Sequence, residues 1–434
     1  MLLGFSDAAL TGHYLEAPHL AAMNLMAYVL WLLYGLFSFV AIGATALVAR
    51  AVGAGDREGA SRVANQAFVV GIVFAVVAVL VGWLGADWIV GRLQLEGESA
   101  VLAARFLRFV LPVLPMVMFD AVGIACLRGA GDMIAGLAVM AVVNLVNVAV
   151  AWSLVLGLGP LPRLGWDGLA IGTACGYLVG GMLVLMLLAK GRSGLQLRPR
   201  WLRPDGALIR RLLRVGVPGG LDTLLVIGCQ LWFVAIVNRL GDVAAAAHGI
   251  AIRVESLGYL PGLAFQLAAT TLAGQFLGAG DPRRAGRAVW TTSAVGGGVM
   301  CLAGVLFFTQ AQGLIDLFLR AGQDQIALLA VPLLRTVALA MPFLAMSMIL
   351  TGALRGAGDT VWPLAFSLIG FLGVRIPLAY WLAFPELYLP GSGPIAGWNL
   401  GVLGAWYAMA ADLAVRGALV AARFAHGGWK QTKV

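Results

Sequence analysis

The chain has 434 residues, of which 61% are hydrophobic and only 11% are charged, and its formal net charge is +9. A soluble domain is nearer half apolar and a quarter charged, so this chain cannot cover a globular surface with polar groups. The composition therefore excludes the soluble globular classes and predicts an integral membrane protein. In such a protein, basic cytoplasmic loops explain the positive charge better than nucleic-acid binding does.

Twelve hydrophobic segments follow one another along the chain, and all but the first are long enough to cross a bilayer, which takes about 20 helical residues. The first is short, about 1–14. The others cover 19–49, 63–91, 100–126, 133–157, 168–190, 207–238, 244–276, 286–318, 326–353, 360–383 and 396–424. We therefore expect an all-α integral membrane fold of twelve transmembrane segments, with the first one truncated.

Lysine and arginine gather in the loops after the second, fourth, sixth, eighth and tenth segments and in the C-terminal tail. The positive-inside rule places these loops and both termini in the cytoplasm, in a multi-pass protein of the cell membrane. The densest basic stretch, 190–214, joins the sixth and seventh segments. We interpret it as a linker that lies along anionic lipid headgroups. It has few interleaved aromatic residues, so no nucleic-acid partner is expected.

A four-residue sequence, GAGD, occurs at 53–56, 129–132, 278–281 and 356–359. The first and third copies, like the second and fourth, are about 225 residues apart, which indicates an internal repeat. Matching turns fall on the same Arg-rich side, so each half crosses the membrane an even number of times. This pattern predicts two six-helix lobes related by a pseudo-two-fold axis along the membrane normal.

The repeat sets the predicted domain boundaries. The N-lobe covers 1–190, the basic cytoplasmic linker 191–206, and the C-lobe with its short tail 207–434. Within each GAGD turn, glycine can take the left-handed conformation that ends a helix, and aspartate can cap the next helix. The turns are therefore interpreted as structural.

Two further residue types argue against other functions. The four cysteines lie in apolar runs without a CxxC pattern, and the four histidines are scattered. These patterns do not suggest a metal centre or an enzyme, and we expect no cofactor.

Several longer stretches resemble the multidrug and toxic compound extrusion (MATE) family of cation-coupled efflux transporters. They are SDAALTGH near the start, ATALVARAVGAGD, LRGAGD, NLVNVAVAWSLVLGLGP, WDGLAIGTACGY and AHGIAIRVESLGYLPG. The resemblance implies twelve helices in two lobes and antiport of small, often cationic or amphipathic compounds against H⁺ or Na⁺ by alternating access. Compared with the family, the first helix is shortened. The alternative is a flippase for lipid-linked oligosaccharides, which has a related two-lobed fold and needs many cationic cavity residues. We expect a monomer.

The resemblance also implies a cation-coupling site. Asp7 matches the carboxylate that takes up the proton or Na⁺, while Asn147 and Thr173 match neighbours in the same N-lobe cluster. Asn144 lies about one turn before Asn147 and is a further candidate. Many relatives have Asp or Asn where this chain has Ala151, and the loss of an oxygen ligand weakens a Na⁺ site more than a proton site. Beyond this possible Na⁺, no metal is expected.

Other intramembrane residues are weaker candidates. Arg253, Glu255, Met116 and Phe119 are predicted to line the substrate cavity, although Arg253 and Glu255 could instead form interhelical ion pairs. Asp412 and Arg416 lie four apart on a helix and are expected to pair with each other. Three charges without an assigned role are expected to be partnered structural charges: Asp120, Arg335 and Arg375.

Overall fold

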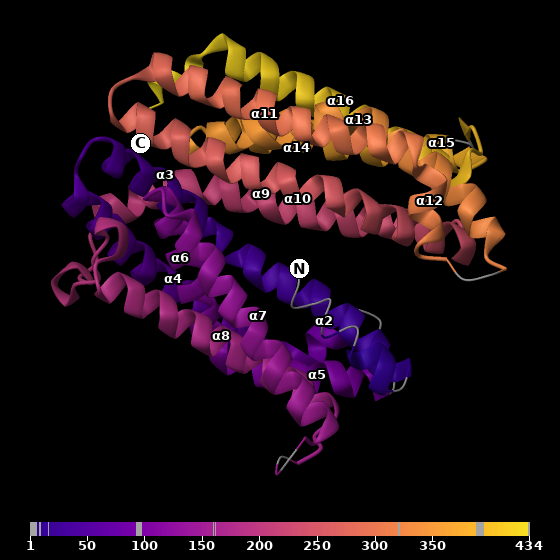
Figure 1. Cartoon of the computed structure of the whole chain (residues 1–434), viewed down its shortest axis with the longest axis horizontal. Coiled ribbons are helices and arrows are strands. Elements are labelled where there is room, and N and C mark those ends of the chain that lie inside the picture. Colours follow the sequence, from indigo (N-terminus) through magenta and orange to yellow (C-terminus); the bar gives the residue numbers. More distant parts are fainter. Residues whose placement is uncertain are drawn as a thin grey trace. The chain divides into compact units, whose positions relative to one another are not determined.

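The computed structural model describes residues 7, 10–15, 17–92, 98–158, 160, 162–319, 322–387 and 395–432. These residues form helices, apart from connecting turns and one small antiparallel ribbon of β1 (Glu386–Leu387) and β2 (Ile395–Ala396). The chain divides into two compact units, Met1–Gly220 and Leu221–Val434 (Figure 1). The units divide within one long helix; the proposed linker at 191–206 remains a prediction.

The N-terminal unit is built around α6, which packs against α3, α4 and α8. Its helices are α2 (Ala17–Leu36), α3 (Ser38–Gly53), α4 (Arg57–Arg92), α5 (Glu98–Val110), η1 (Leu111–Val113), α6 (Leu114–Gly129), α7 (Met133–Leu156), α8 (Trp166–Ala189), η2 (Arg192–Gly194) and η3 (Pro199–Trp201). The helix α9 (Gly206–Asn238) begins in this unit and ends in the next.

The C-terminal unit is built around α13, which packs against α10, α11 and α16. Its helices are α10 (Asp242–Gly278), α11 (Pro282–Thr309), α12 (Ala311–Asp316), α13 (Asp324–Gly356), α14 (Val361–Leu368), the π-helical η4 (Ile369–Arg375), α15 (Ile376–Ala383), α16 (Gly401–His426) and η5 (Gly428–Gln431). Each predicted segment from the second onward coincides with one of these helices or with a consecutive group of them.

The helices have the length and composition of membrane spans. Eight described spans are long and apolar enough to cross a bilayer, and α2 and α3 form a ninth as a pair bent by 42°. Large apolar side chains face outward, such as Leu84 (86% exposed) and Ile134 (73% exposed). Such a surface suits lipid rather than water, and the chain is a multi-pass membrane protein.

The four GAGD turns have the same backbone geometry. In each, the second glycine has a positive φ, between 75° and 91°, and the aspartate N–H donates to the carbonyl five residues earlier at 2.9–3.0 Å. This is the Schellman geometry of a helix end, in which glycine is favoured because it has no side chain to clash. The predicted turn conformation is therefore confirmed at Gly55, Gly131, Gly280 and Gly358.

The predicted aspartate caps are present in three of the four turns. Asp56, Asp132 and Asp281 each accept from a backbone N–H three residues later, at 2.7–2.9 Å. The prediction is wrong for the fourth turn. There, Asp359 accepts two hydrogen bonds from Arg423, and α14 begins after Thr360 without a side-chain cap. At Asp359, the Arg423 guanidinium of α16 is the hydrogen-bond donor in place of a backbone N–H at the start of α14.

The internal repeat extends to side-chain contacts within each unit. In the N-terminal unit, the Thr45 hydroxyl donates to the carbonyl of Ala125 at 3.0 Å. In the C-terminal unit, the Thr270 hydroxyl donates to the carbonyl of Gly352 at 2.9 Å. Both threonines also bond within their own helix, to the carbonyl four residues earlier. The two halves therefore reproduce one helix-to-helix junction, which lies close to a GAGD turn in each.

The basic stretch after α8 is held against α4 by polar side chains. Asn65 donates to the carbonyl of Gln196 and accepts from the N–H of Arg198. One residue later, Gln66 donates to the carbonyls of Trp201 and Arg203. These hydrogen bonds hold the linker backbone against α4, so its arginine side chains extend from an ordered backbone.

Candidate functional site

The helices α7 and α8 pack closely because α8 carries glycine on one face. Added Cβ atoms at Gly168, Gly172 and Gly176 would lie within 3.0 Å of atoms of α7. Such small-residue spacing lets two membrane helices approach at the backbone. The close packing brings Asn147 of α7 beside Thr173 of α8, and both side chains are fully buried.

Asp7 lies against this pair. Its side chain is 1% exposed, and its Oδ2 accepts a hydrogen bond from the Thr173 hydroxyl at 3.1 Å. The Asn147 amide donates to the same hydroxyl at 3.3 Å and also interacts with the carboxylate. The structure therefore brings together three of the four predicted coupling residues. Their role in coupling remains a prediction.

Two oxygens of this cluster have unused hydrogen-bonding capacity. Within the described part of the chain, neither Oδ1 of Asp7 nor Oδ1 of Asn147 has a hydrogen-bond partner. A buried polar atom without a partner costs free energy, commonly about 1–3 kcal/mol, so both oxygens favour a ligand that can donate to them or coordinate them. Ala151, fully buried one turn along α7, adds no oxygen.

The fourth predicted residue, Asn144, bonds within its own helix. Its amide donates to the carbonyl of Met140 on its own helix at 2.6 Å. Over the described residues, no hydrogen bond joins it to Asp7, Asn147 or Thr173. The segment that carries Asp7 is helical at residues 7 and 10–14, where Thr11 donates to the Asp7 carbonyl at 2.7 Å. Residues 1–6 of the predicted shortened first helix lie outside the described part.

The predicted cavity residues on α10 differ from each other. Arg253 is exposed, whereas Glu255 is partly buried and one of its oxygens, Oε2, has no hydrogen-bond partner among the described residues. Glu255 is in electrostatic contact with Arg375 but makes no ion pair with it or with Arg253 in the part of the chain described. The alternative of interhelical ion pairs is therefore unsupported here, and the cavity role remains a prediction.

The predicted cavity residues on α6 contribute to packing inside the N-terminal unit. The backbone of Met116 approaches Gly181 of α8, where an added Cβ would lie 2.7 Å from the Met116 carbonyl oxygen. The Phe119 ring meets the Phe68 ring edge to face at 5.2 Å. These contacts neither require nor exclude a second role in binding, which stays a prediction.

The C-terminal unit contains a buried cluster of charges. Asp412 is fully buried and accepts from Arg375 at 2.8 Å and from Arg416 at 2.6 and 2.8 Å. Arg375 also donates to Gln230 at 2.8 Å. The predicted Asp412–Arg416 pair is therefore confirmed, as is a partner for Arg375. Gly370 of η4 makes room for this pair, since an added Cβ would lie 2.2 Å from an Asp412 oxygen.

Two members of this region were missed by sequence reasoning. Gln230 completes the bonding of Arg375, and the imidazole of His248 accepts from the indole N–H of Trp406 at 3.1 Å. Gln230 lies in none of the quoted stretches, and His248 lies in AHGIAIRVESLGYLPG, where the resemblance gave it no role. Only the helix face on which each residue lies, Gln230 toward Arg375 of η4 and His248 toward Trp406 of α16, could have indicated them. Sequence periodicity does not resolve that face in a helix that is apolar on all sides.

The prediction of a partnered structural charge is not supported for Asp120, which forms no hydrogen bond or ion pair through its side chain in the described part of the chain. Its side chain is fully buried, and neither carboxylate oxygen has a hydrogen-bond partner among the described residues. Two other charges do have partners: the Arg335 guanidinium lies 5.9 Å from the Phe308 ring centre, and Asp222 pairs with Arg355 at 2.6 Å. Asp120 is therefore a buried acid whose role needs a separate explanation.

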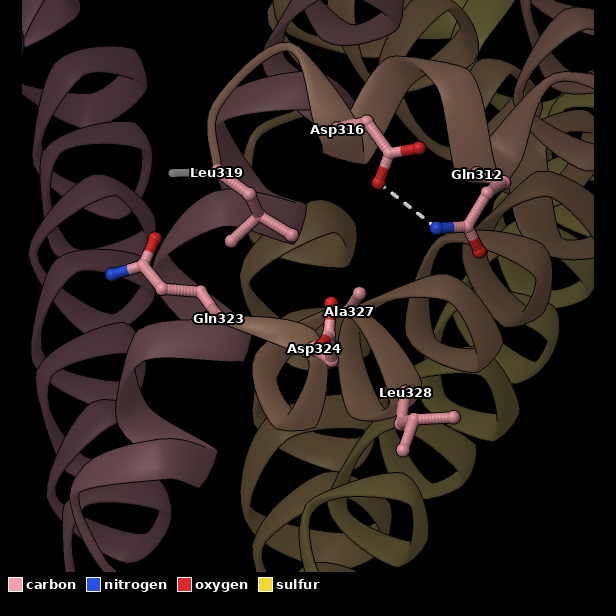
Figure 2. Close-up of a pocket in the computed structure, with 7 residues that line it drawn as sticks. All are labelled: Gln312, Asp316, Leu319, Gln323, Asp324, Ala327 and Leu328. Carbon is pink, nitrogen blue, oxygen red and sulfur yellow. Dashed lines mark hydrogen bonds between the residues drawn. The ribbon is translucent and has the colours of Figure 1, made fainter. Parts of the chain in front are cut away.

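A hollow of about 410 Å³ lies at the turn between α12 and α13. Figure 2 shows its lining, where Gln312 donates to Asp316, and Asp324 lies at the start of α13. A second hollow, of about 330 Å³, lies between the first two GAGD turns and the linker. Neither contains a predicted site residue. No group of three or more His, Cys, Asp or Glu with metal-binding geometry occurs in the described ranges.

Comparisons with known proteins agree with one another. The family model described as MatE matches residues 1–153 and 218–381. The probable multidrug resistance protein NorM of Thermotoga maritima is 28% identical, over the whole of this chain and 90% of the relative. The multidrug resistance protein PmpM of Pseudomonas aeruginosa is 26% identical, over 93% of this chain and 84% of the relative.

Solved structures share the fold. An outward-facing multidrug resistance MATE family transporter of the MOP superfamily matches with a TM-score of 0.86 at 20% identity, covering 99% of this chain and 94% of that chain. A MOP superfamily transporter from Pyrococcus furiosus, for which reverse polarity of the binding pocket suggests a different function, matches with a TM-score of 0.87 at 20% identity, over 99% and 93%. The predicted all-α, two-lobed transporter fold is thereby confirmed.

Proposed function

Because the chain belongs to the MatE family, the multidrug and toxic compound extrusion transporters, we propose that it is a proton-coupled antiporter of the cell membrane. It exports small, often cationic or amphipathic compounds by alternating access. The names of its relatives, multidrug resistance proteins, support this cargo class. Transport of this kind leaves the cargo chemically unchanged, so the protein acts as a carrier and not as an enzyme.

The observation that carries this proposal is the buried Asp7 carboxylate beside Thr173 and Asn147. An ionised carboxylate is costly inside a bilayer unless a cation or several donors compensate for it. Thr173 donates to Oδ2 and leaves Oδ1 without a partner in the described structure. A proton bound at Asp7 removes the charge, and its release toward water restores it. Asp7 can therefore couple cargo movement to a proton gradient.

The same cluster favours H⁺ over Na⁺. A metal cation without its water shell needs several oxygen ligands around it, whereas a proton needs only one oxygen. The cluster has side-chain oxygens from Asp7, Asn147 and Thr173, and Ala151 replaces a possible fourth. The Thr173 oxygen is already shared by two hydrogen bonds. We therefore propose proton coupling.

The alternative function, flipping of lipid-linked oligosaccharides, needs cationic side chains that are free to bind phosphates. Two intramembrane arginines of the C-terminal unit, Arg375 and Arg416, are both committed to Asp412. This pairing supports the antiporter instead. Two remaining proposals follow from the sequence pattern: Arg-rich loops and both termini in the cytoplasm, and lobes at 1–190 and 207–434. We also propose a monomer.

The test is efflux of ethidium from proteoliposomes under an imposed pH gradient or an imposed Na⁺ gradient. We expect the pH gradient alone to drive efflux by the purified protein. In Asp7→Asn the driven component should be lost, because an amide cannot bind and release the proton. The matched control is Asp242→Asn, which makes the same chemical change at an exposed position in the first turn of α10.

Two results would reject the proposal. Efflux driven by the Na⁺ gradient but not by the pH gradient would reject proton coupling. Undiminished pH-driven efflux in Asp7→Asn, with Asp242→Asn equally active, would reject Asp7 as the coupling residue.

A further inference from the structure

Asp120 is a second buried acid of the N-terminal unit, and the coupling mechanism above does not use it. It lies in the middle of α6 and is fully buried. Both of its carboxylate oxygens lack a hydrogen-bond partner among the residues that the structure describes. A lost hydrogen bond at one oxygen could be a local defect. Two such oxygens on one fully buried carboxylate make its ionised form costly.

One face of α8 connects Asp120 with Asp7. Thr173, Tyr177 and Gly180 are spaced by four and three residues, so they lie along a single face of the helix. Thr173 donates to Asp7, and Gly180 leaves the space that Asp120 occupies, since an added Cβ there would lie 3.0 Å from Oδ1 of Asp120. Seven residues of helix span about 10 Å, which sets the axial separation of the two acids.

Tyr177 lies between the two acids on this face. Its phenol group interacts electrostatically with both Asp120 and Asp7. A change of charge at either acid is therefore felt at the same hydroxyl group. This shared neighbour provides a physical link between them inside one unit.

The other surroundings of Asp120 are nearly free of charge. Its electrostatic neighbours in the described chain are Arg128 on α6, Tyr34 on α2 and Tyr177 on α8. Arg128 is eight residues along α6, or about 12 Å. From α7, Val143 reaches the same place beside Gly180. An ionised carboxylate in such surroundings has a desolvation cost of several kcal/mol, and among the described residues only the more distant Arg128 offsets it, without forming an ion pair.

We propose that Asp120 is a second proton-binding carboxylate of the N-terminal unit, linked to Asp7 through Tyr177. This inference rests on the proposed antiport. In one state a proton from water binds a carboxylate oxygen of Asp120 and makes the group neutral, as its dry surroundings require. In another state, which the transport cycle reaches only when Asp7 has also exchanged its proton, the same proton returns to water.

The first test is infrared difference spectroscopy of the reconstituted protein across a pH titration, which detects the carbonyl band of a protonated carboxyl group. We expect Asp120→Asn to remove one such band and Asp7→Asn to remove another, while Asp242→Asn leaves both. A spectrum unchanged by Asp120→Asn would overturn the inference. If Asp120→Asn does not fold, Asp120→Glu must shift the same band, and an unshifted band overturns the inference equally.

The second test is the coupling ratio, measured from the pH gradient that just balances an ethidium gradient. We expect about two protons per ethidium in the unmodified protein and about one in Asp120→Asn, because linkage counts the protons bound differently in the two states. An unchanged ratio overturns this inference and leaves antiport through Asp7 standing. Loss of pH-driven efflux in the unmodified protein would instead reject the proposed function, whereas the infrared band would still report on Asp120.

Discussion

Replacing Asp412 by alanine tests the buried charge cluster of the C-terminal unit. The substitution leaves Arg375, whose side chain is 3% exposed, without its anionic partner and facing a second cation, Arg416. Breaking a buried ion pair by removing one partner costs about 3–5 kcal/mol. Arg375 keeps its bond to Gln230 and its position 4.7 Å from the Phe371 ring, so we expect a cost near the lower end, about 3 kcal/mol.

The assay is reversible unfolding in mixed detergent micelles, which measures the free energy of unfolding. The matched control is Glu58→Ala, which breaks another carboxylate–arginine pair at spacing four, Glu58–Arg62. Both partners of that pair are more than half exposed. Such an exposed pair contributes about 0.3–0.5 kcal/mol. If Asp412→Ala costs no more than Glu58→Ala, the reasoning that desolvation makes this cluster costly to break is refuted.

Three further predictions use the same kinds of measurement. Gly172→Leu should abolish pH-driven efflux and destabilise the protein by about 1–3 kcal/mol, because an added Cβ would already lie 2.7 Å from Ala151. The control Gly298→Leu, where an added Cβ meets no atom within 4 Å, should have neither effect. Equal efflux by the two variants would contradict the close-packing account. Asp281→Ala should cost about 1 kcal/mol through the lost helix cap, and no change in the free energy of unfolding would count against it. The Arg192 guanidinium lowers the pKa of Asp132 from 3.8 to about 2. The stabilisation that ionised Asp132 contributes should therefore be present above pH 3.8 and disappear as the pH falls toward about 2. A destabilisation by Asp132→Asn that persists below this pH range would contradict this prediction.

The fold was predictable because several local signals agreed. The apolar segments have the length of membrane spans, and the four GAGD turns require the glycine conformation that Gly55 and Gly280 adopt. Both halves contain the same helix-to-helix junction, in which the hydroxyl of Thr45 or Thr270 donates to a carbonyl of a neighbouring helix. The sequence around these junctions is therefore similar in the two halves, which is why the repeat is visible. Only the fourth cap failed, because Arg423 arrives at Asp359 from a distant helix, and no local pattern reports such a contact.

The site was less accessible to sequence reasoning. Three coupling candidates meet, but Asn144, one turn from Asn147 in sequence, bonds to its own helix instead. Helical spacing gives the face of a residue only approximately, and a helix apolar on all sides offers no pattern to orient it. Asp120 was expected to have a partner because buried charges are usually paired. Its lack of a hydrogen-bond partner among the described residues depends on the apolar neighbours Gly180 and Val143, which come close only in the folded structure.

The central claim is that protons bound at Asp7 drive export, and simultaneous recording of proton and ethidium fluxes in one proteoliposome preparation tests it most directly. We predict that protons move opposite to ethidium in the unmodified protein and in Asp242→Asn. We also predict that Asp7→Asn neither moves protons nor accumulates ethidium against its gradient. Uphill ethidium movement coupled to proton flux in Asp7→Asn would contradict the account.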